Sequence, residues 1–136
     1  MQDTANERLK FVSSYIFRNR SLPVLETLVT YLKDETSLTY HDIALLLNRN
    51  DRTIWTSYNR AKGKTIKPKK ETEKKEVLIP LLVFQDRTIS VFESMIKYLK
   101  EELNLRYHEI AVLLNRNDRT IWTVYNRAAK KKANIK

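Results

Sequence analysis

The sequence predicts a mainly α-helical protein made of two tandem three-helix helix-turn-helix units. The first observation is an internal repeat, because YHDIALLLNRNDRTIWTSYNR at residues 40–60 returns as YHEIAVLLNRNDRTIWTVYNR at residues 107–127. The second is the pattern within each copy, two short amphipathic segments joined by Asn-Arg-Asn, which is typical of a helix-turn-helix. The third is the complete identity of residues 46–56 and 113–123, which includes positions expected to face solvent. Core packing alone does not require that identity.

The net charge and the cysteine content limit the kinds of partner and of binding site that the protein can have. The 136-residue chain has a net charge of +10 and no cysteine. A basic protein favours a polyanionic partner, which is nucleic acid or an anionic membrane surface. Without cysteine, disulfides and thiolate-ligated zinc are excluded. A polar start and the lack of a long apolar run predict a cytoplasmic protein with no signal peptide and no membrane partner.

The repeat also predicts the domain boundaries. Trp55 and Trp122 set an offset of 67 positions, which gives a first unit at 1–62, a basic linker at 63–76 and a second unit at 77–136. Units of this size bury little surface on their own. We therefore expect the units to pack against each other or to form a homodimer. The linker is rich in lysine and glutamate, so it is expected to be a solvated tether.

An apolar leader precedes the helices of each unit, at residues 9–17 and 77–84. Its β-branched and aromatic residues show no helical period. Each leader is therefore expected either to form a short extended segment that pairs with its copy or to pack as an apolar segment on the helices.

The first helix of each unit follows the leader. Residues 23–34 carry apolar side chains at helical spacing, and the second copy keeps this stripe, so both helices are expected to face the core. Ser90 and Glu93 have the spacing of a capping box at the start of the second copy. The two stripes are Leu25, Leu28, Val29 and Leu32, and Phe92, Met95, Ile96 and Leu99.

The helix-turn-helix itself comes next. Its first helix is expected at residues 40–47 and 107–114, and its second begins after Asn50 and Asn117, which are good N-caps. Asparagine also tolerates the left-handed conformation that a tight turn requires. Leu45 and Val112 fall on the outer side of the first helix, where an apolar residue in both copies indicates contact between units.

The second helix of the motif carries the candidate binding residues. On a helical wheel, Arg52, Thr56 and Asn59 cluster opposite the apolar face. In the major groove of DNA, arginine recognises guanine, asparagine recognises adenine, and the threonine methyl contacts thymine. The copies are Arg119, Thr123 and Asn126. Phosphate contacts are expected from Arg49, Arg60 and Lys62, and from Arg116, Arg127 and Lys130 or Lys131.

These residues resemble a known family. Residues 40–64 match the form of the helix-turn-helix in region four of bacterial sigma factors, with Asp-Ile-Ala, Thr-Ile and Arg-Ala at the family's distances. Similar helices occur in response-regulator output domains. The resemblance implies that the second helix enters the major groove, and it assigns Arg52, Trp55, Thr56 and Asn59, with Arg119, Trp122, Thr123 and Asn126, to DNA. The turn departs from the family at Asn48 and Arg49, and nothing resembles the sigma segment that melts promoters.

Two residue types have alternative interpretations. The rings of Trp55 and Trp122 are expected to pack within a unit or between units, with stacking on DNA as the alternative. His41 and His108 lie beside acidic residues at a helix start, and surface or capping roles are expected for them rather than metal ligation. We expect no metal, no cofactor and no catalytic constellation, so the protein is not expected to be an enzyme.

The sequence thus predicts a DNA-binding protein that reads two similar half-sites in duplex DNA, with transcription regulation as its expected role. If the units pack with two-fold symmetry, the half-sites are inverted and about one helical turn apart, roughly 34 Å, and if the units are merely strung together they form direct repeats. The alternative is a sigma-like adaptor that binds RNA polymerase or another protein, with only non-specific DNA binding.

Overall fold

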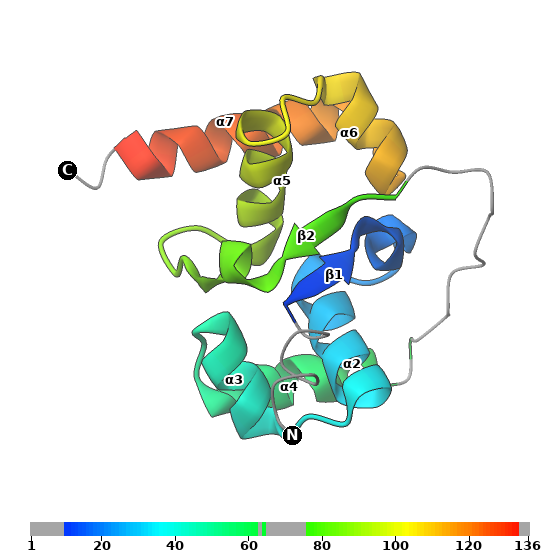
Figure 1. The fold of residues 1–136 in the computed structure, drawn as a ribbon, viewed down its shortest axis with the longest axis vertical. Coiled ribbons are helices and arrows are strands. Elements are labelled where there is room, and N and C mark those ends of the chain that lie inside the picture. Colours follow the sequence, from blue (N-terminus) through cyan, green and yellow to red (C-terminus); the bar gives the residue numbers. More distant parts are fainter. Residues whose placement is uncertain (1–9, 63, 65–75, 134–136) are drawn as a thin grey trace.

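The computed structural model describes residues 10–62, 64 and 76–133, and it confirms the mainly α fold (Figure 1). Two short strands form an antiparallel ribbon. No helix in the described ranges is both long and apolar enough to span a bilayer. The elements are β1 (Phe11–Ser13), η1 (Ser14–Arg18), α2 (Val24–Thr36), α3 (Tyr40–Leu47), α4 (Asp51–Ala61), β2 (Leu78–Pro80), η2 (Leu81–Gln85), α5 (Val91–Glu101), α6 (Tyr107–Leu114) and α7 (Asp118–Ala133), where η denotes a 3-10 helix.

Side chains at the helix starts explain why the helices begin where they do. The Oδ1 atom of Asn50 accepts a hydrogen bond from the Thr53 N–H at 2.7 Å, and Asn117 caps α7 in the same way at 2.8 Å. Ser90 and Glu93 form the expected capping box at the start of α5. Such caps satisfy backbone N–H groups that have no partner within the helix. The predicted starts of these helices are confirmed.

The apolar stripes of α2 and α5 form the centre of the core. Leu28, Val29 and Leu32 are at most 1% exposed, and Met95, Ile96 and Leu99 are fully buried. Helix α2 runs past its predicted end at Asp34 and stops at Ser37, which adopts the left-handed conformation with φ 59°. Each stripe packs against the second helix of the motif in its own repeat, α2 on α4 and α5 on α7.

The ribbon relates the two repeats by an approximate two-fold axis. Val12 of β1 lies opposite Ile79 of β2 in the antiparallel pair, and these residues are equivalent because they are 67 positions apart. Equivalent residues that face each other in an antiparallel pair lie on a local two-fold axis. The rings of Phe17 and Phe84, which are also equivalent, have centroids 6.2 Å apart. The prediction that the leaders pair with each other is confirmed.

Each strand is shorter than its apolar leader because the chain turns into a 3-10 helix after three residues. This turn directs Phe17 and Phe84 into the core, where both are at most 1% exposed. The first part of each leader therefore pairs as a strand, and the second part packs on helices. Both expectations for the leader hold, each for a different part of it.

Each leader packs on the opposite repeat. Segment η1 contacts α6 and η2 contacts α3, while each also contacts the first helix of its own repeat. In Figure 1, η1 (blue) lies beside α6 (orange-yellow). One continuous cluster of buried residues includes side chains from both repeats. The division into residues 1–62 and 77–136 therefore describes the sequence repeat, whereas the core belongs to both units.

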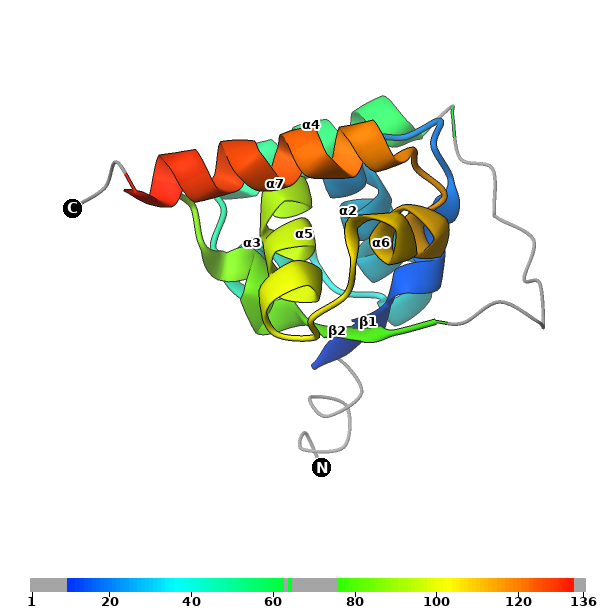
Figure 2. The ribbon, with the colours of Figure 1, turned by 90° about the horizontal axis from the view of Figure 1, so that it is seen from above.

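With each leader packed on the opposite repeat, α4 and α7 lie on one face of the molecule. Figure 2 shows both helices along one edge and the β1–β2 ribbon along the opposite edge. In Figure 1 the same two helices lie toward the two ends of the long axis. We call the side formed by α4 and α7 the recognition face, and the opposite side the ribbon face.

The shared core predicts a single unfolding transition. Phe84→Ala should lower the free energy of unfolding by about 3–5 kcal/mol, because it removes a fully buried ring from the contact between repeats. Denaturant unfolding followed by circular dichroism measures this change. Leu82→Ala is the control, since Leu82 is 74% exposed and should change stability by less than about 0.5 kcal/mol. Two separate transitions in the natural protein would contradict a shared core.

Candidate nucleic-acid interface

The recognition face carries the same side chains twice. Arg52 of α4 and Arg119 of α7 are exposed, as are Asn59 and Asn126. Thr56 is half-buried, whereas its copy in α7 is exposed. The opposite side of each helix is fixed by buried residues, Ile54 and Ala61 in α4 and Ile121 and Ala128 in α7. The predicted orientation of both helices is therefore observed.

Two tyrosines fix the rotation of these helices. The hydroxyl of Tyr58 donates to Asp34 at 2.7 Å, and that of Tyr125 donates to Glu101 at 2.8 Å. The hydrogen bond to Glu101 raises the pKa of Tyr125 to about 12. Each bond ties the second helix of the motif to the first helix of its own repeat. Both rings pack at the core with the hydroxyl at the rim, as the sequence predicts.

The tryptophans do not pack as expected. Trp55 and Trp122 are each 54% exposed, so neither ring is covered by its own unit or by the other repeat. The expectation that these rings pack within or between units is wrong. A half-exposed indole on a helix of the recognition face is available to a partner, and aromatic faces of this kind stack on bases and sugars.

The exposed asparagines make one internal bond. The Nδ2 atom of Asn59 donates to the Trp55 carbonyl at 2.8 Å, and Asn126 donates to the Trp122 carbonyl at the same distance. A side-chain amide has two N–H donors and one carbonyl acceptor. One N–H and the oxygen therefore remain for a base, and these are the groups that a bidentate contact with adenine uses.

The turn residues have structural roles. Asn48 and Asn115 adopt the left-handed conformation, with φ 55° and 57°, and end α3 and α6. Their Nδ2 atoms also reach the other repeat, where Asn48 donates to the Gln85 carbonyl at 2.9 Å and Asn115 to the Arg18 carbonyl at 3.0 Å. The departure of the turn from the sigma pattern thus has a structural reason in the contact between repeats.

The arginines of the turn donate to backbone carbonyls. Arg116 Nη1 donates to the carbonyls of Phe17 at 3.0 Å and Leu114 at 2.7 Å. Arg49 Nη1 donates to the Leu47 carbonyl at 2.9 Å, and its Nη2 reaches backbone carbonyls in the loop before α5. Both guanidinium groups are half-buried and satisfy backbone oxygens, so they have a role in joining the repeats that the sequence did not predict, while their phosphate contacts stay a prediction.

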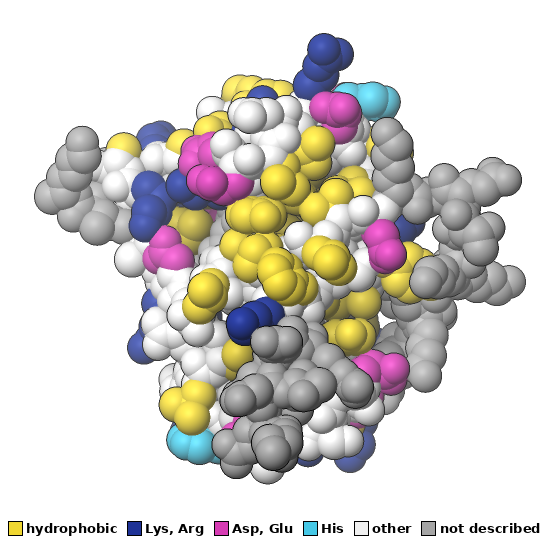
Figure 3. All heavy atoms as spheres, viewed as in Figure 1, with side chains coloured by type: hydrophobic (Ala, Val, Ile, Leu, Met, Phe, Trp, Pro, Cys, Tyr) yellow, Lys and Arg dark blue, Asp and Glu magenta, His cyan; other side chains and the backbone are white. Residues whose placement is uncertain are grey.

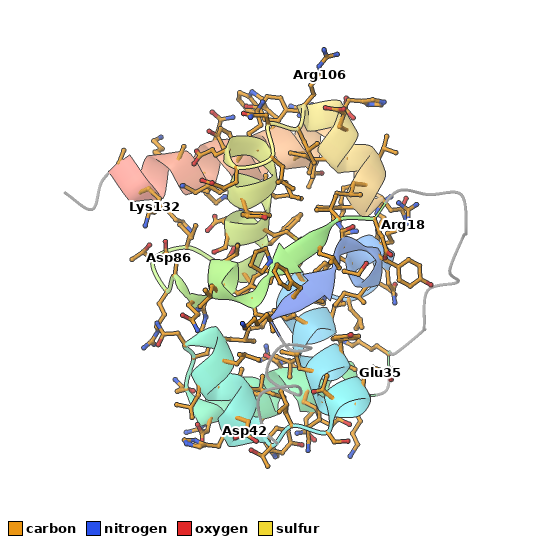
Figure 4. All side chains as sticks on the ribbon, in the orientation of Figure 1. Arg18, Glu35, Asp42, Asp86, Arg106 and Lys132 are labelled. Carbon is orange, nitrogen blue, oxygen red and sulfur yellow. The ribbon has the colours of Figure 1, made fainter. Side chains whose placement is uncertain are left out.

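Arg18 and Gln85, which the sequence did not single out, also join the two repeats. Arg18 Nη1 donates to the carbonyls of Val112 at 2.7 Å and Leu113 at 3.0 Å, at the end of α6. The equivalent Gln85 donates from Nε2 to the Leu46 carbonyl at 2.9 Å, at the end of α3. Helix ends leave carbonyls without partners, and these side chains satisfy them from the other repeat. Figure 4 shows Arg18 beside α6. Arginine and glutamine differ in charge, so the two positions do not look equivalent when the repeats are compared as sequences.

The lysines at the end of α7 also have internal partners. Lys131 Nζ lies 2.9 Å from an oxygen of Glu93, whose side chain is 2% exposed. Burial acts to raise the pKa of Glu93, but hydrogen bonds from Ser90 and Lys131 outweigh it and lower that pKa. Lys131 is therefore the partner of a buried carboxylate, a role that the sequence did not predict, and its phosphate contact stays a prediction.

Lys132 has a comparable partner in the loop before α5. Its Nζ atom lies 2.7 Å from Asp86, and Figure 4 labels the two residues close together. Burial acts to raise the pKa of Asp86, yet hydrogen bonds from Lys132 and Thr88 lower it to about 2. The contact ties the end of α7 to the segment that follows η2.

The other predicted phosphate ligands are on the surface. Arg60, Lys62 and Lys130 are exposed. Arg127 is 56% exposed at the side chain, and its Nε lies 4.0 Å from Glu93. These four residues stay candidates for phosphate contact.

A further prediction concerns the first helix of the motif. Leu45 and Val112 are 65% and 55% exposed, so the expectation that they mediate contact between units is wrong. The contact uses the leaders instead.

The two histidines of the motif have acidic partners. His41 Nδ1 lies 3.1 Å from Asp51, and His108 Nδ1 lies 3.0 Å from Asp118. Each histidine thus joins the first turns of the two motif helices.

Comparison of the chain with models of protein families, with curated proteins and with solved structures found no match.

The end of α7 allows two adjacent lysines to be compared. Lys131→Ala should lower the free energy of unfolding by about 1 kcal/mol, because the buried carboxylate of Glu93 loses a charged donor while its other partners are kept. Lys130→Ala, one position earlier on the exposed side, should change it by less than about 0.5 kcal/mol. Thermal unfolding at neutral pH measures both. Equal stability of the two variants would contradict the structural role of Lys131.

Proposed function

We propose that the protein binds duplex DNA sequence-specifically, with α4 and α7 in the major groove at two similar half-sites. The observation that carries the proposal is the duplicated surface of the recognition face, where Arg52, Trp55 and Asn59 and their copies are exposed on two helices of one side. The identical turn has a structural explanation, but the identity of exposed Arg52 and Trp55 with Arg119 and Trp122 has none within the described part of the chain. A common external ligand explains it.

The chemistry of these residues suits base recognition. An α-helix fits the major groove, where arginine donates to guanine and an asparagine amide pairs with adenine. Arg60, Lys62, Arg127 and Lys130 contact phosphate and fix the register of the protein on the duplex. The net charge of +10 attracts the polyanion from a distance. The resemblance to sigma region four supports the same placement, and transcription regulation is the role that we propose.

The two-fold arrangement supports inverted half-sites. Equivalent residues of the two repeats meet at Val12 and Ile79, so α4 and α7 are related by the same axis. A two-fold protein presents its recognition helices to the two strands in opposite directions, which matches an inverted repeat with half-sites about one helical turn apart, roughly 34 Å. The chain is in effect a dimer whose two halves are covalently joined.

A protein partner is the second candidate. Phe11, Leu78 and Leu82 are 46%, 59% and 74% exposed. Figure 3 shows apolar side chains gathered over the ribbon on the face that points away from α4 and α7. Exposed apolar clusters are common at protein interfaces. A partner such as RNA polymerase could bind there while DNA is held on the recognition face.

The base-reading assignment is tested by removing both arginines. Arg52→Ala combined with Arg119→Ala should reduce the preference for the specific site over random DNA by about tenfold or more for each half-site, since a bidentate contact with guanine discriminates by about 1–3 kcal/mol. Lys69→Ala with Lys70→Ala in the linker is the control, and it should weaken specific and random binding equally. Titration of both duplexes by fluorescence anisotropy measures the ratio. Equal loss on both duplexes for the arginine pair would remove the assignment.

The orientation of the half-sites is tested by selection from a random pool of duplexes at two salt concentrations. We expect one short motif to emerge twice, inverted, at a fixed spacing, because the two-fold axis fixes the relative orientation of α4 and α7. Insertion of five base pairs between the half-sites should abolish tight binding, since it rotates them by about half a helical turn. A direct repeat would contradict the two-fold arrangement on DNA, and the lack of any motif would contradict sequence-specific binding.

A further inference from the structure

A basic hollow lies where the first turns of α2 and α5 meet the turn that precedes α7. Arg20 lines it together with Arg116, and its other walls include the first turns of α2 and α5, so residues of both repeats form it. Its volume is about 610 Å³. Figure 2 shows residues 19–23, in blue, running beside the first turn of α7 toward the recognition face. In the DNA complex proposed above, this hollow would face the stretch of duplex between the two half-sites.

The positive charge of this hollow is not cancelled by the residues that form it. Arg116 is half-buried, burial lowers the pKa of its guanidinium, and the nearby charge of Arg20 lowers it further. None of the described residues that line the hollow is acidic. An anion between or beside two like charges relieves their repulsion. The hollow thus favours an anionic ligand on electrostatic grounds.

We propose that Arg20 binds a backbone phosphate of the duplex at the centre of the site, between the half-sites. This inference rests on the proposed function. Arg20 is exposed and offers its guanidinium donors to phosphate oxygens. Arg116 remains bonded to the carbonyls of Phe17 and Leu114 and contributes only its fixed charge. The site exists only because the leader of the first repeat packs beside the turn of the second.

The equivalent position in the other half is weaker. Arg87 corresponds to Arg20, being 67 positions later, and its charge lowers the pKa of Arg49. However, Asp86 takes the place of Asn19, its charge acts to raise the pKa of Arg49, and its own pKa of about 2 keeps it ionised. Asp86 is also paired with Lys132, so its carboxylate offsets only part of the charge of this second arginine pair. Arg20 is therefore the stronger phosphate ligand, and Arg87 is its natural control.

The first experiment measures affinity and its salt dependence for single variants on specific and random duplexes. Arg20→Ala should weaken binding to both by about tenfold. It should also reduce the slope of log affinity against log salt by about one. Arg87→Ala should have a smaller effect. Lys10→Ala removes an exposed positive charge from the start of β1 on the ribbon face and should change affinity by less than about twofold. Arg20→Gln, which keeps a long polar side chain, should behave like Arg20→Ala.

The second experiment locates the contact. Each phosphate between the half-sites is replaced in turn by a neutral methylphosphonate, and binding is measured for the natural protein and for Arg20→Ala. One replacement should weaken the natural protein about tenfold without further weakening the variant, since both changes remove the same contact.

Three results would overturn the Arg20 contact, and they distinguish its failure from failure of the proposed function. If Arg20→Ala matches Lys10→Ala and no phosphate shows the non-additive pattern, the Arg20 contact is wrong, while the proposed function stands as long as the natural protein still prefers its site. If Arg20→Ala weakens binding only to the specific duplex, Arg20 reads a base and the phosphate contact is wrong. If the natural protein prefers no sequence, the proposed function itself is wrong and the central contact fails with it.

Discussion

The contact between the crossed leaders is the interaction on which the rest of the structure depends. Phe17 and Phe84 meet beside the ribbon at the two-fold axis, and each leader then covers the first motif helix of the opposite repeat. A single repeat of this size buries little surface by itself. By packing on the opposite repeat, each leader adds buried apolar surface to that repeat. Arg18 and Gln85 also donate from the leaders to the carbonyls at the ends of α6 and α3. The orientation of α4 relative to α7 follows from the packing of each leader on the opposite repeat.

The same contact explains much of the repeated sequence. Asn-Arg-Asn recurs in both turns because each of its residues has a structural role. The first asparagine ends a helix in the left-handed conformation and hydrogen-bonds to the other repeat. The arginine donates to backbone carbonyls, and the second asparagine caps the next helix. With these roles assigned, Arg52, Trp55 and their copies stand out as identical, exposed and turned toward the recognition face. A shared external ligand accounts for these exposed identical residues, whereas the contacts between repeats account for the identical turn.

The two halves differ in ways that matter for a two-fold protein. Glu93 is held by Ser90 and Lys131, whereas the equivalent Glu26 has a buried Oε1 without a partner in the described part of the chain. Pro23 replaces Ser90 and has no N–H to offer. Helix α7 also runs farther than α4, and the sequence has Gly63 where the second repeat has Lys130. Glycine disfavours helix, and among the described residues it is Lys131 and Lys132 of the second repeat that contact α5 and the loop before it.

The sequence by itself determined the helices, their caps and the outward face of the second motif helix. These features are local, because helical spacing, an asparagine cap and a left-handed turn depend on residues a few positions apart. The tertiary structure decided which charged residues are free. Arg49, Arg116 and Lys131 look like phosphate ligands in sequence, yet their donors bind carbonyls or a buried carboxylate. Those partners lie in other elements, and no spacing within the motif reveals them. The same holds for Leu45 and the tryptophans, whose exposure depends on how the helices pack in three dimensions.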